Sequence, residues 1–296
     1  MSIDHKQTYP NLPFFAVSLV YLIELYVYLI NIISGFFFVN VLLTATVLIA
    51  LFTLNVRKLK TPKSPFVLSI IFSVLLLIYE MPLILVDNHQ YLVTSPDAPE
   101  ELIKGSGIFL LAVNETILGS VDSEQELRES YVNSDAEFFE IKSIKNHERY
   151  NGKNMAIIEA MGIHKDGFEQ MAENVRGYLN TGNDSIDEFL ERDGSGGNSA
   201  GLALALSSLS EQGEYKNKLQ FGVTGAINEI GEVMEIGSVK EKVWIANENG
   251  LPHMILPLAN LAEAKEVKKA LSLPIELIGV HDVEQAIQII EELNNM

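Results

Sequence analysis

Three long apolar runs dominate the first third of the chain. Pro13–Ser34 contains one charged residue, Glu24, and Phe36–Val56 contains none. Pro65–Val86 contains only Glu80, near its end. A helix rises about 1.5 Å per residue, so each run is long enough to cross about 30 Å of hydrocarbon. The pattern predicts a three-helix transmembrane region at residues 1–87, with spans at about 13–34, 36–56 and 65–86.

Two other interpretations of these runs are less favoured. A cleaved signal peptide has one shorter apolar run with a small-residue cleavage site, which does not describe three runs. A single bent span over Pro13–Val56 would use 44 residues, twice the length that one crossing needs.

Basic residues predict the orientation of the spans. The short link between the second and third runs is rich in Lys and Arg, namely Arg57, Lys58, Lys60 and Lys63. By the positive-inside rule this link is cytoplasmic, and Lys6 favours a cytoplasmic N-terminus. The remainder of the chain after Asp87 is then predicted to be extracytoplasmic.

Two acidic residues fall within the apolar runs. A charged carboxylate in the middle of a span costs about 3 kcal/mol. We therefore expect Glu24 to be protonated or to make a hydrogen bond between helices. Glu80, near the outer boundary, is expected to reach the lipid headgroups.

The pattern changes after a polar linker at residues 88–106. Short apolar runs alternate with helical periodicity, which predicts a mixed α/β (α+β) domain over residues 107–296. Strands are predicted at Gly107–Val113, Glu137–Ile144, Met155–Ile163, Leu219–Val223, Val233–Ile236, His253–Leu256 and Ile275–Val280. Helices are predicted at Ser123–Tyr131, Lys165–Leu179, Ser199–Leu209, Val239–Asn249, Ala259–Leu271 and Val283–Leu293.

Finer features of this domain follow from its turn residues. Leu219–Val223 and Val233–Ile236 are predicted to pair around a turn at Asn228–Gly231. Gly250 is the expected C-terminal cap of one helix and Asp282 the expected N-cap of the last. Asn180–Asn198 is predicted to be a polar, glycine-rich loop.

The charge of the chain is confined to its second part. The 296 residues include 21 Lys and Arg against 39 Asp and Glu, a net charge of −18. The first 87 residues hold five basic and four acidic residues, so the remainder carries −19. An acidic domain of this kind argues against a nucleic-acid partner, since phosphate binding needs a basic surface.

Missing residue types and motifs exclude several chemistries. With no Cys, the chain has no disulfide, thiolate metal site or Cys nucleophile. The six His residues are dispersed and show no metal-ligand spacing. There is no Walker-type ATP loop, and we expect neither a metal nor a cofactor. A spatial Ser-His-Asp triad stays open, because such triads are not visible in sequence.

A glycine-rich octet, Gly194 to Gly201, precedes the apolar helix predicted from Ser199. A Ser at a helix start lies beside unpaired N–H groups and positive dipole potential, which a tetrahedral oxyanion would use. Ser199 is thus either a nucleophile or an ordinary helix cap. A phosphate loop is disfavoured because no Lys-Ser/Thr pair follows the last glycine.

A second motif, Gly237-Ser238-Val239-Lys240-Glu241-Lys242, opens a helix. The two lysines are two positions apart and do not share a helix face, so one can be solvated while the other turns inward. A Lys activates a Ser only when neutral, which at pH 7 requires its pKa to fall from about 10.4 to about 7.5. Alternatively, both lysines are solvated. Thr224-Gly225 ends a predicted strand, where the Thr hydroxyl could orient an amine.

Taken together, Gly197-Asn198-Ser199-Ala200-Gly201, Thr224-Gly225 and the Lys motif resemble the proteolytic domain of Lon proteases. That family has a GPSAG-like nucleophile motif, a later TG step, and a Lys motif whose second Lys is catalytic. Ser199 precedes Thr224 by 25 positions and Lys242 by 43, which match the family spacing. The resemblance covers roughly residues 107–296 and is stronger after Asp193.

The resemblance implies a serine endopeptidase with a Ser-Lys dyad. Ser199 would be the nucleophile and Lys242 the general base, while Thr224 would help to hold the Lys242 amine. Backbone N–H groups around Ser199, in the loop of Gly197, Asn198 and Ala200, would stabilise the oxyanion. The substrate would be an unfolded or flexible polypeptide, because no ATPase domain is present. The resemblance also implies a ring of six copies, held here by a membrane anchor in lipid.

Four positions depart from the family motifs: Gly196 for an acid, Asn198 for Pro, Ala226 for an acid and Ser238 for Gly. These departures leave room for an alternative, a catalytically silent peptide-binding or regulatory membrane protein. A further alternative, a transporter or channel subunit that uses Glu24 and Glu80, has little support, because three spans with two acidic residues do not by themselves indicate transport. We identify no PDZ domain between the anchor and the protease.

Overall fold

The computed structural model describes residues 12–55, 64–85, 89–134, 136–163, 165, 167–179, 184–192 and 196–296. The chain divides into two compact units. The first unit contains Met1–Leu92, Ile117–Arg128 and Lys142–Met161, and the second contains Val93–Thr116, Glu129–Ile141 and Gly162–Met296. The predicted domain bounds at 1–87, 88–106 and 107–296 stay predictions.

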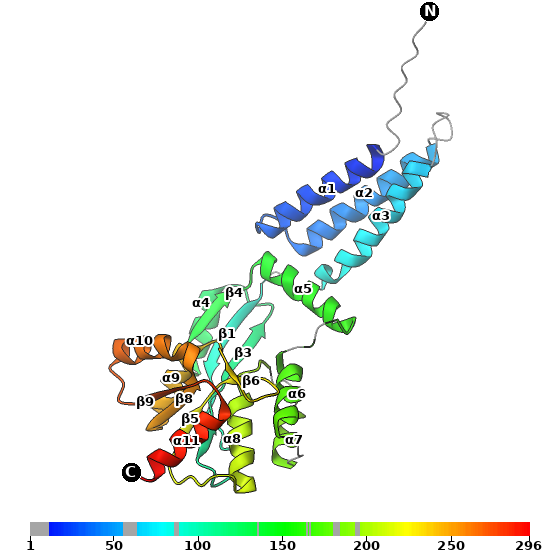
Figure 1. Ribbon diagram of the computed structural model, residues 1–296. Coiled ribbons are helices and arrows are strands. Elements are labelled where there is room, and N and C mark those ends of the chain that lie inside the picture. The colour runs from blue at the N-terminus through cyan, green and yellow to red at the C-terminus, as the bar shows by residue number, and fades with distance from the viewer. Residues whose placement is uncertain are drawn as a thin grey trace, which may run out of the picture. The chain divides into compact units, whose positions relative to one another are not determined.

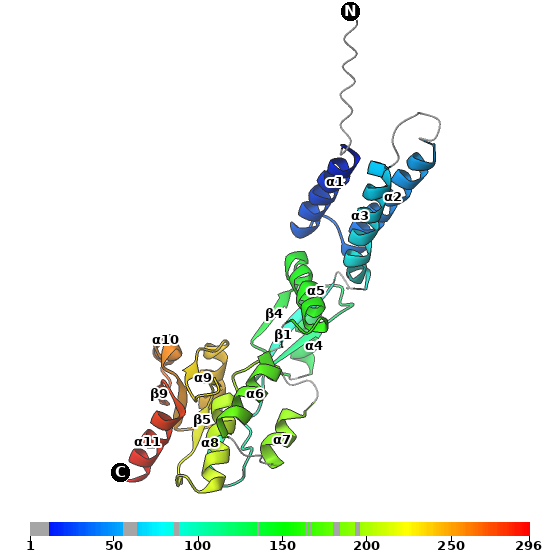
Figure 2. The ribbon, with the colours of Figure 1, turned by 45° about the vertical axis from the view of Figure 1, so that its right-hand side comes forward.

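Apolar helices form the N-terminal part of the first unit (Figures 1 and 2). They are α1 (Leu12–Leu29), α2 (Gly35–Asn55) and α3 (Ser64–Glu80), followed by the 3₁₀ turn η2 (Met81–Ile84). Gly35–Leu54 and Ser64–Ile84 are long and apolar enough to cross a membrane, whereas Pro13–Leu29 is a shorter apolar helix. Length and composition therefore support two of the three predicted spans. The basic link, Lys6 and Asp87 lie outside the described residues.

The helix α5 (Asn146–Ala160) corrects the prediction of a strand at Met155–Ile163. A short apolar run does not separate strand from buried helix, and contacts to the other helices decide here. The Asn146 side chain donates to the carbonyl oxygens of Tyr28 and Ile33, each at 2.8 Å. The Asn146 amide donates to the side chain of Asn31 at 2.7 Å. These bonds fasten the start of α5 to the turn between α1 and α2.

A buried ion pair fastens the middle of α5. Glu80, at the end of α3, is 0% exposed. The prediction that its side chain reaches out to lipid headgroups is therefore wrong. Its Oε2 accepts a hydrogen bond from Lys153 Nζ at 2.5 Å. Its Oε1 accepts from the hydroxyls of Tyr21 at 2.7 Å and Tyr150 at 3.0 Å. The Lys153 amine also lies 3.9 Å from the centre of the Tyr79 ring. The carboxylate is thus fully partnered by α1 and α5, as a buried charge requires.

The acid in the first apolar helix, Glu24, behaves differently. The Oε2 atom of Glu24 is buried and has no hydrogen-bond partner among the described residues. The hydrogen bond between helices that we expected for Glu24 is therefore not found there. The polar contact between α2 and α3 is instead made by the hydroxyls of Thr46 and Ser73, 2.5 Å apart.

A parallel sheet of order β2-β5-β8-β9 is the framework of the second unit. Its strands are β2 (Ile108–Leu110), β5 (Phe221–Val223), β8 (His253–Pro257) and β9 (Glu276–Val280). Ile108 is opposite Phe221, and Phe221 is opposite His253. The predicted pairing of Leu219–Val223 with Val233–Ile236 is wrong, because β7 (Val233–Met234) pairs antiparallel with β6 (Ala226–Ile227).

Helices cover both faces of this sheet, giving the mixed α/β architecture that the sequence predicts (Figure 1). One core contains residues of α6 (Gly167–Leu179), α7 (Asp184–Leu190), α8 (Gly201–Gln212) and α11 (Val283–Asn294). The other contains residues of α9 (Val239–Glu248) and α10 (Leu261–Leu271), which follows the 3₁₀ turn η3 (Leu258–Asn260). Neighbours along β8 alternate between the cores, with Ile255 in the first and Met254 and Leu256 in the second.

Most predicted helices of this unit are confirmed. The C-terminal end of α9 is followed by Gly250 at φ +70°, and Asp282 caps α11 by accepting from the Gln285 amide at 2.7 Å. The prediction of a loop over Asn180–Asn198 is wrong for Asp184–Leu190, which form the helix α7. The polar residues and glycines on both sides of this helix favoured the loop prediction. Ile186, Phe189 and Leu190 of α7 follow helical spacing and are buried.

The division between the units runs through the remaining elements. Strands β1 (Tyr91–Pro96), β3 (Val113–Leu118) and β4 (Glu140–Ser143) form a sheet of order β3-β1-β4. The helix α4 (Glu124–Asn133) precedes β4. The strand β4 and the helix α4 confirm the elements predicted at 137–144 and 123–131.

The ion pair at Glu80 leads to a stability prediction. Lys153→Met leaves a buried carboxylate without its counter-ion and should lower the free energy of unfolding of the full chain by about 3–5 kcal/mol. Glu80→Gln combined with Lys153→Met should lower it by clearly less. Thermal unfolding in detergent, read as a double-mutant cycle, measures both. With Glu80→Gln alone as the third variant, a loss in the double variant equal to the sum of the two single losses would show that the pair contributes no coupling.

Candidate active site

A short loop before α8 holds Ser199 in place. Gly197 has φ +76°, a left-handed conformation that favours glycine. A Cβ atom on Gly201 would lie 3.2 Å from the Ile227 backbone nitrogen, a tight contact, so a larger residue here would push α8 away from β6 by a few tenths of an ångström. The structure therefore explains why glycine is favoured at these two positions of the motif.

The end of β5 fastens the backbone of Ser199. Its carbonyl oxygen accepts from the Gly225 amide at 2.8 Å and from the Thr224 hydroxyl at 3.3 Å. The Leu202 amide in turn donates to the Gly225 carbonyl at 2.9 Å. Thr224 itself is fully buried, and its amide donates to Ile255 of β8. The Thr-Gly step thus connects the serine loop to the central sheet.

Lys242 approaches from the other face of the sheet. It lies on α9 and is only 4% exposed, with Val239 and Val243 buried on the same helix. Burial lowers the pKa of Lys242 to about 8, although the charges of Glu115 and Glu241 oppose the shift. With a pKa of 8, about a tenth of the amine is neutral at pH 7, far more than in a solvated lysine. Lys240 is exposed, whereas Lys242 is buried. One lysine of the motif is therefore solvated while the other turns inward.

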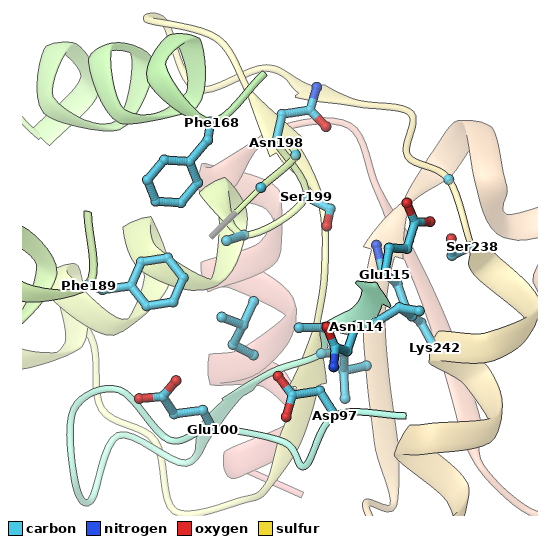
Figure 3. Close-up of a pocket in the computed structure, with 18 of the residues that line it drawn as sticks. Asp97, Glu100, Asn114, Glu115, Phe168, Phe189, Asn198, Ser199, Ser238 and Lys242 are labelled. Carbon is cyan, nitrogen blue, oxygen red and sulfur yellow. The ribbon is translucent and has the colours of Figure 1, made fainter. Parts of the chain in front are cut away.

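Ser199 and Lys242 line one cavity of about 550 Å³ (Figure 3). Gly197, Asn198 and Ala200 line it beside Ser199. The structure thus brings together every predicted site residue except Thr224, which lies behind the loop and contacts the Ser199 backbone. Figure 3 shows the Ser199 hydroxyl and the Lys242 side chain directed into this cavity.

Ser238 explains one departure from the motif. It precedes α9 and has φ +56°, the left-handed region that L side chains other than Asn and Asp rarely adopt. The glycine expected at this position would adopt this conformation without strain. Ser238 thus adopts a conformation that glycine favours, at the position where the family motif has glycine.

Sequence reasoning missed a large part of the cavity wall. The missed side chains come from β1 to β3 and from α6 and α7, far from the three motifs. They are Asp97, Glu100, Leu110, Asn114, Glu115, Phe168, Phe189 and Arg192. Phe168 lies on a helix that the sequence predicts, but no local pattern marks these residues as parts of one wall.

Comparison with known proteins identifies the domain. Residues 192–292 match the family model described as the Lon protease (S16) C-terminal proteolytic domain. This segment, about a third of the chain, is similar to the Lon proteolytic domain. It contains all three motifs and the elements from α8 to the last turns of α11.

Individual Lon proteases agree with this assignment. Lon protease 1 of Thermus thermophilus is 33% identical over 94 residues, which is 32% of this chain and 12% of that protein. Lon protease of Mycoplasma mycoides is 28% identical over 137 residues, 46% of this chain and 16% of that protein. Archaeal Lon protease of Methanocaldococcus jannaschii is 30% identical over 99 residues, which is 33% of this chain and 14% of that protein. The aligned part thus spans less than a fifth of each relative.

Proposed function

We propose that this protein is a membrane-anchored serine endopeptidase that hydrolyses peptide bonds with a Ser199–Lys242 dyad. One observation carries the proposal: a serine and a buried lysine with a lowered pKa line the same cavity of a Lon-family domain. Neutral Lys242 is the general base, and Ser199 is the nucleophile.

The reaction begins when the Lys242 amine takes the proton of the Ser199 hydroxyl as the oxygen attacks the substrate carbonyl. The resulting oxyanion needs hydrogen-bond donors. Among the described residues, the amides of Ser199 and Ala200 donate to no protein acceptor, so they can serve this purpose. The Lys242 ammonium then protonates the leaving amine, and water hydrolyses the acyl-enzyme by the same route.

Thr224 acts through the backbone in this proposal. Its hydroxyl and the Gly225 amide hold the Ser199 carbonyl, which sets the direction of the nucleophile. We expected Thr224 to hold the lysine amine instead. Its contact with Ser199 favours the role of a positioning residue.

The substrate is proposed to be an unfolded or flexible polypeptide, because an extended segment enters a cavity of this size without unfolding work. The anchor is proposed to comprise α1, α2 and α3 in lipid. The ring of six copies that the resemblance implies belongs to the same proposal.

The dyad is tested by labelling the full chain in detergent with a serine-reactive probe. We expect labelling at Ser199 and cleavage of an unfolded protein, both reduced at least about 10³-fold in Ser199→Ala and Lys242→Ala. Lys240→Ala is the matched control, two positions away and exposed. Folded protein that neither labels nor cleaves would support the catalytically silent alternative instead.

The pH dependence tests the base. Cleavage rate should rise about tenfold per pH unit below pH 8 and level off above it, because Lys242 must lose its proton first. Glu115→Gln should shift the rise of the cleavage rate to lower pH, since the Glu115 charge raises the pKa of Lys242. Glu291→Gln on the exposed face of α11 is the control and should leave this rise unshifted. A flat profile between pH 6 and 9 would exclude Lys242 as the titrating base.

The orientation is proposed to be extracytoplasmic for residues after the third apolar helix. It rests on the positive-inside rule and the basic link at residues 57–63. A protease added outside intact cells should then digest the C-terminal part of the chain. Digestion only after the membrane is opened would reverse the orientation.

A further inference from the structure

One wall of the cavity beside Ser199 is aromatic. The ring centres of Phe168 and Phe189 lie 6.1 Å apart, and Phe189 is buried in the core. Leu110, also buried, comes from β2. Together these side chains offer an apolar surface that fits the stem of a long side chain.

Two carboxylates stand beyond this apolar wall. Figure 3 shows Asp97 and Glu100 directed into the cavity, at the end of the view opposite to Ser199. Glu100 is fixed because its amide and carbonyl pair with those of Leu110 at 3.2 and 2.9 Å. Asp97 follows directly after β1, which ends at Pro96.

A cation already occupies part of this wall. The Arg192 guanidinium donates to Glu100 Oε2 at 2.7 Å and lies 5.1 Å from the centre of the Phe189 ring. A carboxylate and an aromatic face thus hold a guanidinium here through the two interactions that recognise basic side chains.

The charges of the cavity are not balanced. Arg192 pairs with Glu100, and the charge of Glu115 acts on Lys242. Asp97 makes no hydrogen bond or ion pair with any described residue. A carboxylate without a partner therefore faces the cavity at the end opposite to Ser199, beyond the apolar wall.

We propose that this part of the cavity is the subsite for a basic side chain, Lys or Arg, at the residue before the scissile bond, and that Asp97 selects it. The inference rests on the proposed function. The aliphatic stem packs on Phe168 and Phe189, and the charged head reaches Asp97. A substrate Glu at this position meets like charge and is disfavoured.

The experiment uses the full chain in detergent and four peptides that differ only in the residue before the scissile bond. These residues are Lys, Arg, norleucine and Glu, where norleucine keeps the stem without the charge. We expect kcat/KM for Lys and Arg about fivefold above norleucine, with Glu lowest, since a partly exposed ion pair is worth about that factor. Asp97→Asn should remove the preference for Lys and Arg over norleucine, Asp97→Glu should retain it, and Asp97→Lys should place Glu above Lys.

Controls separate this inference from the proposed function. Glu266→Gln on α10 removes the same charge outside the cavity and should leave all ratios unchanged. Ser199→Ala should abolish cleavage of all four peptides, and if it does not, the proposed function fails. If Ser199→Ala abolishes cleavage but Lys and norleucine are cleaved equally, only the subsite is overturned. An equal loss for every peptide in Asp97→Asn overturns it as well.

Discussion

The burial of the Lys242 amine is the constraint on which the site depends. An ammonium group is strongly hydrated, so a fold that removes it from water must supply compensation elsewhere. Here the apolar side of α9 packs under the sheet, and Glu115 and Glu241 are the opposite charges that act on the amine. The parallel sheet is what makes this possible, because β5 and β8 bring the serine loop and the lysine helix to one edge.

The motifs Gly197–Gly201 and Gly237–Lys242 predict two side chains, Ser199 and Lys242, that line one cavity, whereas the contact of Thr224 with the Ser199 backbone was not expected. Each motif sits where a strand or helix begins or ends, so its backbone role is local and visible in sequence. The segment 155–163 was predicted as a strand but belongs largely to the helix α5. The hydrogen bonds of Asn146 and the ion pair of Lys153, which hold α5 against other helices, are not visible in the local sequence. The cavity wall could not be predicted as one surface, because Asp97, Glu115 and Phe189 come from segments far apart in the sequence.

The departures from the Lon motifs have unequal structural weight. Ser238 retains the left-handed backbone that its glycine counterpart would supply, so the change alters local strain and not the path of the chain. Asn198 replaces a proline in a loop that bonds from β5 already hold. The replacements thus fall where the surrounding fold determines the conformation.

The contact between Glu80 and Lys153 has a consequence for biosynthesis. The two residues are 73 positions apart, so the third apolar helix is made well before its partner. At about 5 to 20 residues per second, the interval is roughly 4 to 15 seconds. The contact between α3 and α5 at Glu80 therefore forms only after this interval, and until then the carboxyl of Glu80 lacks its basic partner.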